Sequence, residues 1–478
     1  ALGGDSIKAL RLVADMRARG WRLGLKTVFA HPRLDTQAAQ LVAAEASLAE
    51  RTVEGEIPLL PIQKWFLESH RDSPLHHFNQ AVFYRALDRV DAMRLQRAVD
   101  ALWRRHASLR ASFHRDTTGR WRQSMRPASS PAPEIARIDL RALDAAAARE
   151  RELRWVRELQ AGFDLTATPL VKYGWVSAPG GDRVLCLTHH LVSDWVSHRI
   201  LLEDFAASYA GEKLLPAVTE VDEWVQAGQR WARDRSSRAA ALAGWSGVAR
   251  ECAPFAATEP AGRYGEVTTA SQVLGAAETA RLRSIVAAVP GATVRDALLA
   301  AMVTAERAVL GREALAVALE GHGRESLAEA ALDVSRTAGW FTSLYPCRVS
   351  SDTVSGVRDA LALLPDSGKG YDFLRACAEG GEVPAASTSI GLNYLGEFSP
   401  GEKGAAFALD GELPEGGIAP EFERDHPREV SAWVFGGELH LLLAFRAESP
   451  EARQMAVWIE RVRGALEAIA GDPPGTRG

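Results

Sequence analysis

Apolar residues recur at helical spacing near the start of the chain. They predict a helix that begins at Asp5 or Ser6, either of which can cap it, and that ends at Gly20. The apolar face consists of Ile7, Leu10, Val13 and Ala14. An alanine-rich stretch over residues 35–50 predicts a second helix. Residues 51–57 are polar and contain a glycine, which is typical of a linker, so the part before them is expected to be a small helical unit.

Beyond residue 58, predicted strands and helices alternate. Strand-like alternation or short apolar runs occur over residues 78–84, 183–188, 314–319 and 438–445. Amphipathic helical patterns occur at 95–106 and 293–310. This repetition predicts an α/β protein with two lobes of similar size, which we place at 58–238 and 239–478.

Length and charge narrow the function classes. The chain has 478 residues, which at about 150 residues per domain corresponds to roughly three domain-sized units. Its net charge of −5 lacks the positive excess of a nucleic-acid-binding surface. No apolar run approaches the roughly 18 residues of a membrane helix. We therefore expect neither nucleic acid nor a membrane as a partner.

The four cysteines stand far apart in the sequence. They lack C-x-x-C spacing and indicate neither a zinc knuckle nor a disulfide framework, which favours a reducing, cytoplasmic compartment. They are Cys186, Cys252, Cys347 and Cys377. The chain also begins at Ala1 without a methionine and enters directly into a motif, so we expect a fragment of a longer polypeptide.

The sharpest local feature is an apolar strand that ends in His189 and His190, before a helix capped near Asp194. A histidine fixed at a strand end can transfer protons near neutral pH, because its unperturbed pKa is about 6.5. Taken alone, the pair is more simply explained as two core histidines. Both histidines, Asp194 and His198 could also hold a metal, but no H-E-x-x-H pattern or cysteine supports such a site, and we expect none.

A second candidate lies at residues 319–325, where an apolar strand delivers Glu320 into a glycine-flanked turn beside His322 and Arg324. Burial would raise the pKa of Glu320, so that it could exchange a proton at neutral pH. The plainer interpretation is a charged loop in which Glu320 pairs with Arg324.

Two further segments, 336–342 and 390–398, mix glycine with aromatic and hydrogen-bonding side chains. Asn393 and Tyr394 could donate hydrogen bonds to an enolate oxygen, as an oxyanion hole does. Taken singly, the aromatic residues of either segment are better explained as core. The sequence has no G-x-S-x-G elbow, which argues against a hydrolase with a serine nucleophile.

Taken in order, these motifs resemble the carrier and epimerization domains of nonribosomal peptide synthetases. Residues 2–7, Leu-Gly-Gly-Asp-Ser-Ile, are similar to the pantetheine-attachment motif of a peptidyl carrier that precedes an epimerization domain. The epimerization motifs follow as Pro-Ile-Gln-Lys-Trp-Phe at 61–66, the His-His-x-x-x-Asp element, and segments at 320–325, 336–342, 368–371 and 393–396. The resemblance covers nearly the whole chain, and its specificity lies in the order of the elements.

The resemblance implies a fold and a division of the chain. Residues 1–50 would be the C-terminal part of an all-helical peptidyl carrier that lacks its first helix, joined by the linker 51–57 to an epimerization domain. That domain would consist of two chloramphenicol-acetyltransferase-like lobes, a V-shaped pseudo-dimer with an active-site tunnel between them. Ser6 would carry a covalent 4'-phosphopantetheine arm, and no metal or nucleotide would be needed.

The resemblance also implies an activity, the interconversion of the L and D configurations at the α-carbon of an aminoacyl or peptidyl thioester. His190 and Glu320 would flank that carbon from opposite lobes as acid and base, with the assignment between them left open. Asn393 and Tyr394 would stabilise the enolate. The implied partners are the tethered substrate, an adenylation domain upstream, and a condensation domain downstream that would select the D form from a mixture.

Neighbouring residues would hold the site in shape, with Asp194 paired to Arg324 and His189 in a structural role. Two positions depart from the family pattern. The family usually has a small residue after the motif aspartate and a tryptophan three positions later, where this chain has Trp195 and His198. The bulk of Trp195 is expected to narrow the tunnel or reshape the approach of the carrier.

Three alternatives stay open. A condensation domain shares the double histidine and the lobes but forms a peptide bond with an amine nucleophile, and the segments at 320–324 and 336–341 favour epimerization over it. A free-standing coenzyme-A acyltransferase would need neither a fused carrier nor Ser6, and its Asp-Phe-Gly-Trp-Gly element is absent from the sequence. A catalytically silent domain that only docks carriers is the third, suggested by Trp195.

Overall fold

The computed structural model describes residues 6–24, 27–28, 31, 33–43, 51–215, 219–325, 332–378, 383, 386–398, 406–411 and 414–471. Residues 1–5, which hold most of the predicted attachment motif, and residues 44–50 of the second predicted helix lie outside these ranges. Ser6 begins helix α1 (Ser6–Ala18), and its side chain is likewise outside the description.

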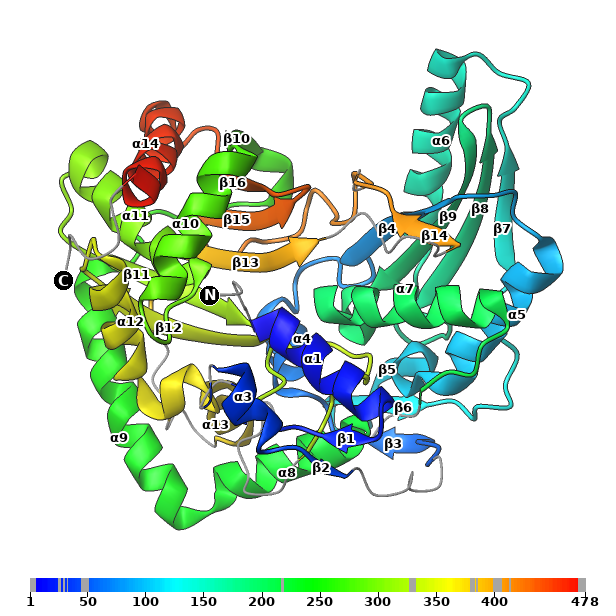
Figure 1. Ribbon diagram of the computed structural model, residues 1–478, viewed down its shortest axis with the longest axis horizontal. Helices are drawn as coiled ribbons and strands as arrows, with labels where there is room; N and C mark the ends of the chain where they lie inside the picture. Colours follow the sequence, from blue (N-terminus) through cyan, green and yellow to red (C-terminus); the bar gives the residue numbers. More distant parts are fainter. Residues whose placement is uncertain are drawn as a thin grey trace.

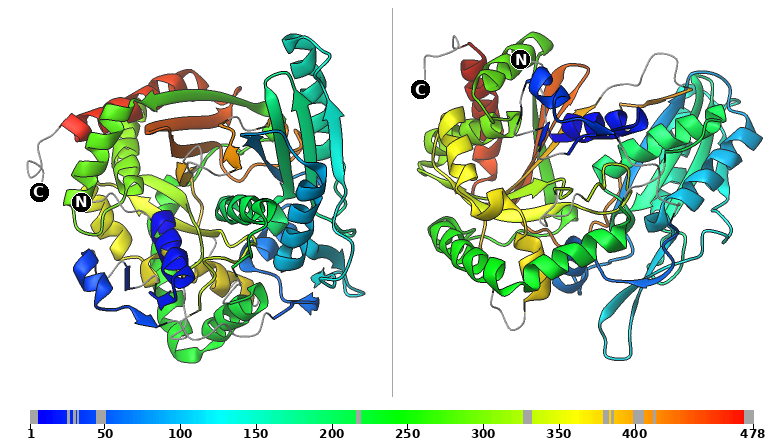
Figure 2. Two further views of the ribbon diagram at one scale, coloured as in Figure 1. Left: turned by 45° about the vertical axis from the view of Figure 1, so that its right-hand side comes forward. Right: turned by 60° about the horizontal axis from the view of Figure 1, so that its bottom comes forward.

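The N-terminal unit differs from the expected all-helical carrier fragment. After α1 come α3 (Leu34–Ala38) and two short strands, β1 (Trp21–Arg22) and β2 (Val42–Ala43), which pair antiparallel. Within the described part of the second predicted helix, only α3 is helical, and Val42 and Ala43 instead form the strand that pairs with β1. These elements lie outside the large sheets (Figure 2), and Arg17 meets Asp333 of the main body at 3.6 Å.

The first lobe is built on a five-stranded sheet of order β14-β4-β9-β8-β7 (Figure 1). One apolar cluster joins one face of this sheet to α5 and α7, and α6 packs on the other face. The strands of this lobe that come from the first half of the chain, and its helices, are β4 (Asn79–Ala86), β7 (Ile135–Asp139), β8 (Val171–Ala178), β9 (Gly181–His189), α5 (Ala92–Arg105), α6 (Ala145–Gln160) and α7 (Trp195–Ala210). Strand β9 lies between β4 and β8 and is buried from Val184 onward, so it carries His189 to a fixed place.

Part of the segment predicted as a linker belongs to a small three-stranded sheet. Strand β3 (Gly55–Ile57) pairs with β6 (Trp121–Met125), which pairs in turn with β5 (Ala111–Arg115). Val53 and Ile57 are buried in the core of the body. The segment 51–57, predicted as a linker, thus already belongs to the first lobe from Val53 onward.

The second lobe is built on a six-stranded sheet of order β10-β16-β15-β13-β11-β12 (Figure 1). Helices α10, α11 and α14 pack against one another beside this sheet, and α11 is buried along most of its length. The bounds are β10 (Val267–Leu274), β11 (Leu315–Gly321), β12 (Ser343–Val349), β13 (Ile390–Phe398), β15 (Arg428–Phe435), β16 (Glu438–Arg446), α10 (Ala276–Ala288), α11 (Val294–Leu310), α12 (Val354–Ala362) and α14 (Ala452–Gly471). Strand β13 pairs in parallel with both β11 and β15, which aligns the ends of all three.

The lobes do not divide where the sequence predicted. Helices α8 (Val221–Arg233) and α9 (Arg235–Cys252) contact β12 or α13 (Tyr371–Cys377) of the second lobe, so the predicted boundary at 238/239 falls inside α9. In addition, β14 (Phe407–Leu409) crosses back and pairs with β4 of the first sheet. Neither arrangement follows from local patterns, because both depend on contacts between distant segments. Short 3-10 turns complete the fold at 107–110, 190–192, 253–255, 264–266 and 365–368.

One continuous apolar core joins the two lobes. Phe66 of α4 (Pro61–Ser69) stands at its centre, with its ring centroid 5.5 Å from that of Trp340 and 5.6 Å from that of Phe422. Phe78, just before β4, lies 4.8 Å from Phe422. Because aromatic rings from both halves of the chain interlock here, the base of the V is packed as a single core.

Two glycines with left-handed backbone differ in their surroundings. Gly311 follows α11 with φ 66°, and a Cβ there would meet no atom within 4 Å. Gly323 follows β11 with φ 62°, and a Cβ there would lie 1.7 Å from the carbonyl oxygen of Phe341. Glycine at 323 thus lets the loop after β11 press against the backbone near Phe341.

Comparing Gly323→Ala with Gly311→Ala isolates this close approach. Both substitutions carry the left-handed strain of about 1–2 kcal/mol, and Gly323→Ala should cost about 1–3 kcal/mol more because Phe341 must move. Urea denaturation followed by tryptophan fluorescence gives both free energies of unfolding. Equal losses for the two variants would show that the loop relaxes freely.

Candidate active site

His189, the last residue of β9, is held by backbone on both ring nitrogens. Its Nε2 donates to the carbonyl of Leu75 at 2.8 Å, and its Nδ1 accepts from the amide of Leu191 at 3.2 Å. The side chain is fully buried, and burial lowers its pKa to about 3. The imidazole is therefore neutral and fixed, and both nitrogens are occupied within the first lobe.

His190 follows in a different environment. Its ring lies 4.2 Å from the ring of Trp340 and 5.6 Å from that of Phe78, centroid to centroid. Nδ1 lies 2.9 Å from the carbonyl oxygen of Ser193, and a carbonyl can only accept, so Nδ1 carries the hydrogen. Burial lowers the pKa of His190 to about 4, so the imidazole is neutral and its lone pair is on Nε2.

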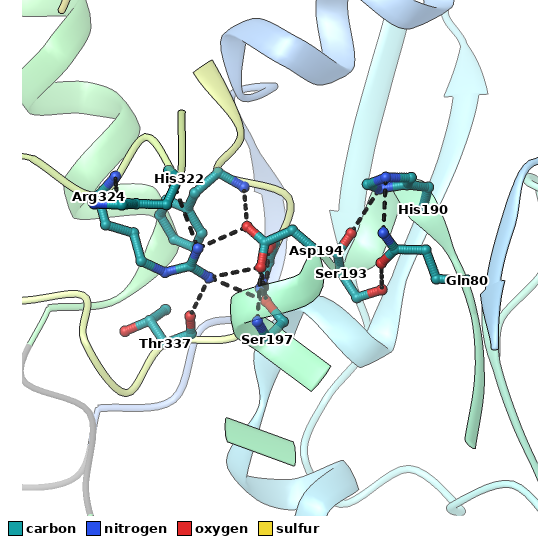
Figure 3. A network of polar contacts seen from close by, with 10 residues as sticks. Gln80, His190, Ser193, Asp194, Ser197, His322, Arg324 and Thr337 are labelled. Carbon is teal, nitrogen blue, oxygen red and sulfur yellow. Dashed lines mark hydrogen bonds and ion pairs between the residues drawn. The ribbon is translucent and has the colours of Figure 1, made fainter. Parts of the chain in front are cut away.

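Asp194 ties the two lobes together at the start of α7 (Figure 3). Arg324, in the loop after β11, donates to Asp194 Oδ2 at 2.7 Å through Nη1 and to Oδ1 at 3.1 Å through Nη2. The same carboxylate accepts from the amide and hydroxyl of Ser197 and from the amide of Phe341. Burial alone would raise the pKa of Asp194, but the charge and hydrogen bonds of Arg324 hold it below its usual value. Asp194 is thus a fully occupied structural anion.

A second arginine reinforces this junction. Arg336 pairs with Glu203 and Asp204 on α7, and His106 lies 3.0 Å from Asp204. Helix α7 is therefore held by arginines from two segments that follow β11.

Glu320 lies near the end of β11 and receives a hydrogen bond from the side-chain amide of Asn393 on β13, at 2.7 Å from its Oε2. Burial, and then the like charges of Glu429 and Asp425, raise the pKa of Glu320 to about 8. At neutral pH the carboxyl group therefore keeps its proton. Asp425 itself meets His70 at 3.2 Å, and Glu429 meets Arg424 at 3.2 Å.

A cavity of about 210 Å³ brings His190, Glu320 and Asn393 together between the lobes. Aromatic side chains of α4, the first lobe and the segment after β11 line one part of the cavity, and polar and acidic side chains on or beside the second sheet line another. The lining is Ile62, Trp65, Phe66, His70, Phe78, His190, Tyr264, Ala318, Glu320, Trp340, Thr342, Leu344, Gly391, Asn393, Asp425, His426, Glu429, Val430 and Ser431. A smaller cavity that includes Gly323 and Lys369 shares Ile62, Trp340 and Thr342 with it, so the two adjoin.

Several predicted residues lie outside this lining. Tyr394 follows Asn393 on β13, where successive side chains face opposite ways, and it packs against the apolar core instead. Trp195 contacts Phe398 at the end of β13, with ring centroids 5.6 Å apart, and it does not line the cavity whose narrowing was expected. His198 is buried with its Nε2 3.2 Å from the hydroxyl of Thr188.

Sequence reasoning missed Gln80, His70, Asp425 and Glu429. The amide nitrogen of Gln80 lies 3.0 Å from Nε2 of His190. Gln80 is a polar residue near the start of the buried strand β4, which is the signal that could have singled it out. The acidic pair gives no such signal, because charged residues are common on protein surfaces and only the fold brings these two to the cavity.

Metal and membrane features can be stated only for the described residues. Among them, no three His, Cys, Asp or Glu side chains gather closely enough to hold a metal ion. No helix within those ranges is both long and apolar enough to cross a membrane.

The comparison with known families decides the class of the domain. A family model described as condensation domain matches residues 53–476. The chain belongs to the condensation-domain family. The match begins at residue 53, so it gives no support to a carrier over residues 1–50.

Relatives of this condensation-family chain are long synthetases. One of the proteins of linear gramicidin synthase, from Brevibacillus parabrevis, is 32% identical over 99% of this chain, which covers 7% of that protein. Surfactin synthase subunit 1 of Bacillus subtilis (strain 168) is 32% identical over 94% of this chain, which covers 13% of that protein. The chain is therefore a condensation-type domain of the nonribosomal peptide synthetase kind, and it spans a small part of these relatives.

Solved structures share the fold. The epimerization domain from the third module of tyrocidine synthetase B superposes with a TM-score of 0.79 at 28% identity, covering 89% of this chain and 98% of that one. The first condensation domain of the calcium-dependent antibiotic synthetase gives a TM-score of 0.68 at 18% identity, covering 89% of this chain and 99% of that one. The expected two-lobed fold is thus confirmed. Epimerization and condensation domains share this fold, so the fold alone does not distinguish between them.

The Asp194–Arg324 pair should be strongly coupled. Asp194→Asn should lower the free energy of unfolding by about 3–5 kcal/mol, because it leaves a buried guanidinium unpaired. Arg324→Met should be similarly costly, and the double variant should lose less than the sum. Asp139→Asn, which breaks an exposed pair with Arg141, is the control and should change little.

The contribution of the Asp194–Arg324 pair to the free energy of unfolding should depend on pH. The pKa of Asp194 is depressed in the folded state, so its contribution is present above the unfolded pKa of about 3.9 and is lost as pH falls through the folded value. The difference between the wild type and Asp194→Asn should therefore shrink below about pH 4. Urea denaturation at pH 7 and pH 3 tests this, and a pH-independent difference would contradict it.

Proposed function

We propose that this domain interconverts the L and D configurations at the α-carbon of an aminoacyl or peptidyl thioester tethered to a carrier. The observation that carries the proposal is the cavity into which His190 comes from one lobe and Glu320 from the other. At neutral pH the imidazole is uncharged, because its pKa is about 4, and the carboxyl group is protonated, because its pKa is about 8. A base and an acid therefore line one space.

Inversion at the α-carbon needs a base on one face of that carbon and an acid on the other. Nε2 of His190 takes the α-proton, and the electron pair of the broken C–H bond moves into the thioester carbonyl to give an enolate. Glu320 then delivers its proton to the opposite face, and the thioester re-forms with the other configuration. The resulting imidazolium and carboxylate are the acid and base of the reverse reaction, so a mixture of both configurations is expected.

Asn393 supports this chemistry in two ways. One hydrogen of its amide nitrogen holds Glu320, and the second is available to meet the enolate oxygen, since an amide nitrogen carries two hydrogens. We assign the enolate contact to Asn393 alone. Tyr394 lies toward the other face of β13 and receives no contact with substrate in this proposal.

Delivery on a carrier is the second part of the proposal. A tethered substrate meets the cavity at high effective concentration, so the domain needs little affinity for free substrate. Ser6 remains the proposed attachment site of 4'-phosphopantetheine on the strength of residues 2–7 of the sequence. An adenylation domain upstream and a condensation domain downstream are the partners that this implies. The similarity to the epimerization domain of tyrocidine synthetase B supports the epimerization activity.

Peptide-bond formation is the second candidate, because the matching family is that of condensation domains. Such a reaction would use His190 with an amine nucleophile and would not require a protonated Glu320. Exchange of the α-proton without a second substrate separates the two candidates.

The decisive measurement is α-deuterium uptake in deuterated water. We would present aminoacyl-pantetheine thioesters with apolar, basic and acidic side chains to the full chain and follow deuterium by mass spectrometry and chirality by chiral chromatography. Uptake with mixed chirality is expected, and Glu320→Gln or His190→Ala should each lower it about 10²–10⁴-fold, because each removes one proton-transfer group.

Glu397→Gln is the matched control, since it makes the same change on β13 at a residue paired with Arg283 outside the cavity. It should retain wild-type uptake. Absence of uptake across the panel, in folded protein, would reject epimerization and leave condensation or carrier docking.

The pH profile tests the protonation states. Uptake from the L-thioester should be level from about pH 5 to pH 7 and fall about tenfold per unit above about pH 8, because Glu320 then loses the proton that it must deliver. Glu429→Gln should move this fall to lower pH, because the charge of Glu429 helps to raise the pKa of Glu320. A rate that increases through pH 8 would instead make the Glu320 carboxylate the base.

A further inference from the structure

The charges that line the cavity between the lobes are already paired, beginning with His70. Directly after α4, its Nε2 lies 3.2 Å from Oδ1 of Asp425 and its Nδ1 lies 3.2 Å from the carbonyl oxygen of Phe66. A carboxylate and a carbonyl can only accept, so the ring carries a hydrogen on each nitrogen and is a cation. Burial alone would lower the pKa of His70, but the hydrogen bond and charge of Asp425 raise it above its usual value.

The second anion of the lining is matched in the same way. Glu429 lies 3.2 Å from Nη2 of Arg424, whose side chain is fully buried and is not part of the lining. Glu320 adds no charge at neutral pH, because its pKa of about 8 keeps it protonated. Among the described lining residues, each anion therefore has a cation beside it.

An aminoacyl thioester would change this charge balance. Its α-nitrogen is bonded to the carbon between His190 and Glu320, so it lies in the cavity, and it is an ammonium group below a pKa of about 8. The ammonium would be a third cation beside two anions, and an unpaired buried charge is costly. Ionisation of Glu320 would restore the balance, since a nearby cation lowers the pKa of a carboxyl group by about 1–3 units. Glu320 would then have no proton to deliver, whereas an N-acylated nitrogen is uncharged and leaves that proton in place.

Tyr264 gives the cavity a neutral hydrogen-bond donor that the mechanism does not use. It lies in the turn before β10 and lines the cavity, and among the described residues its hydroxyl has no hydrogen-bond partner. Burial, and then the charges of Glu429 and Asp425, raise the pKa of Tyr264 well above its usual value, so the hydroxyl keeps its hydrogen. Both carboxyl groups line the cavity, which places the hydroxyl in its polar part.

The ring of Tyr264 is held by its neighbours. The backbone amide of Tyr264 donates to the carbonyl of Phe422 at 3.0 Å, and the two rings are 6.3 Å apart, centroid to centroid. The guanidinium carbon of Arg424 lies 6.0 Å from the centre of the Tyr264 ring. A side chain that is already fixed loses little conformational freedom when it binds a ligand, so this hydroxyl is a preorganised donor.

The polar part of the cavity opens to solvent. The side chains of Asp425 and Glu429 are 37% and 24% exposed although both line the cavity. In the aromatic part, Phe66 and Trp340 are only 1% and 4% exposed. A chain joined to the α-nitrogen therefore has a way out past the two carboxylates and none through the aromatic part.

We propose that the domain acts on peptidyl rather than aminoacyl thioesters, and that Tyr264 donates a hydrogen bond to the carbonyl oxygen of the amide on the α-nitrogen. That carbonyl belongs to the preceding residue of the peptide, so it is present in a peptidyl substrate and absent from an aminoacyl one. The rest of the peptide extends to solvent past Asp425 and Glu429. The inference rests on the proposed function, because it names the substrate class of the same site.

A comparison of two substrates in two proteins tests the contact. The substrates are an aminoacyl-pantetheine thioester and its N-acetyl form, which adds the carbonyl and removes the charge, and the measurement is α-deuterium uptake at about pH 6, where the free amine is an ammonium group. The wild type should exchange the N-acetyl form about tenfold faster. Tyr264→Phe should lower uptake by the N-acetyl form about three- to tenfold, as expected for one neutral hydrogen bond, and should leave the aminoacyl form within about twofold.

Tyr84→Phe is the matched control, because it removes a phenol hydroxyl from the core of the first lobe, outside the cavity. It should leave both rates unchanged. Equal losses with both substrates in Tyr264→Phe would show a structural role and overturn the contact. Faster uptake by the aminoacyl form in the wild type would overturn the substrate class, while epimerization would stand. Absence of uptake with either form would reject epimerization, and the substrate class with it.

His70→Gln tests the charge balance. The amide can still donate to Asp425, but the cavity then has one anion without a cation, which suits an ammonium group. The roughly tenfold preference for the N-acetyl form should fall to about one, and an unchanged preference would contradict the substrate class. His440→Gln, which removes a histidine stacked on Trp433 outside the cavity, should keep the wild-type preference. Because each ratio is taken within one variant, a loss of folded protein does not alter it.

Discussion

The paired hydrogen bonds between Asp194 and Arg324 are the contact on which the geometry of the site depends. Removing two charges from water is costly, and the cost is offset here because the carboxylate also accepts from Ser197 and Phe341. One anion thereby fixes the start of α7, the turn after β9 and the loop after β11. The positions of His190 and Glu320 relative to each other follow from this junction.

The two reacting groups are prepared by different routes. His190 lies between aromatic rings, so burial disfavours its charged form. Glu320 lies on the side of Asp425 and Glu429, so burial and like charges both disfavour its ionisation. The two shifts oppose each other relative to neutral pH, and as a result both groups are uncharged at rest. An interface between lobes can combine an apolar wall and an acidic wall in a way that one sheet face cannot.

Much of the site was predictable because its residues belong to motifs whose order along the chain resembles that of a known family. This holds for His190, Glu320 and Asn393, which the structure brings to one cavity. Tyr394 shows the limit, since a motif does not say which of two adjacent strand residues faces the cavity. Gln80 was missed because its place at the site comes from its contact with His190, more than 100 residues away, and the acidic residues were missed for the same reason. The α/β lobes were predictable from periodicity, whereas the lobe boundary and the short N-terminal strands depend on long-range pairing.

The pairing of β14 with β4 has a consequence for how the chain is made. Strand β4 ends at Ala86 and its partner begins at Phe407, so the ribosome must add more than 300 residues before that edge of the first sheet is covered. At about 5–20 residues per second this takes roughly 15–60 s. Through that interval the nascent first lobe presents the unpaired backbone groups of β4, which are a template for association with other chains. Protection of this edge during synthesis is therefore a demand that the topology places on the cell.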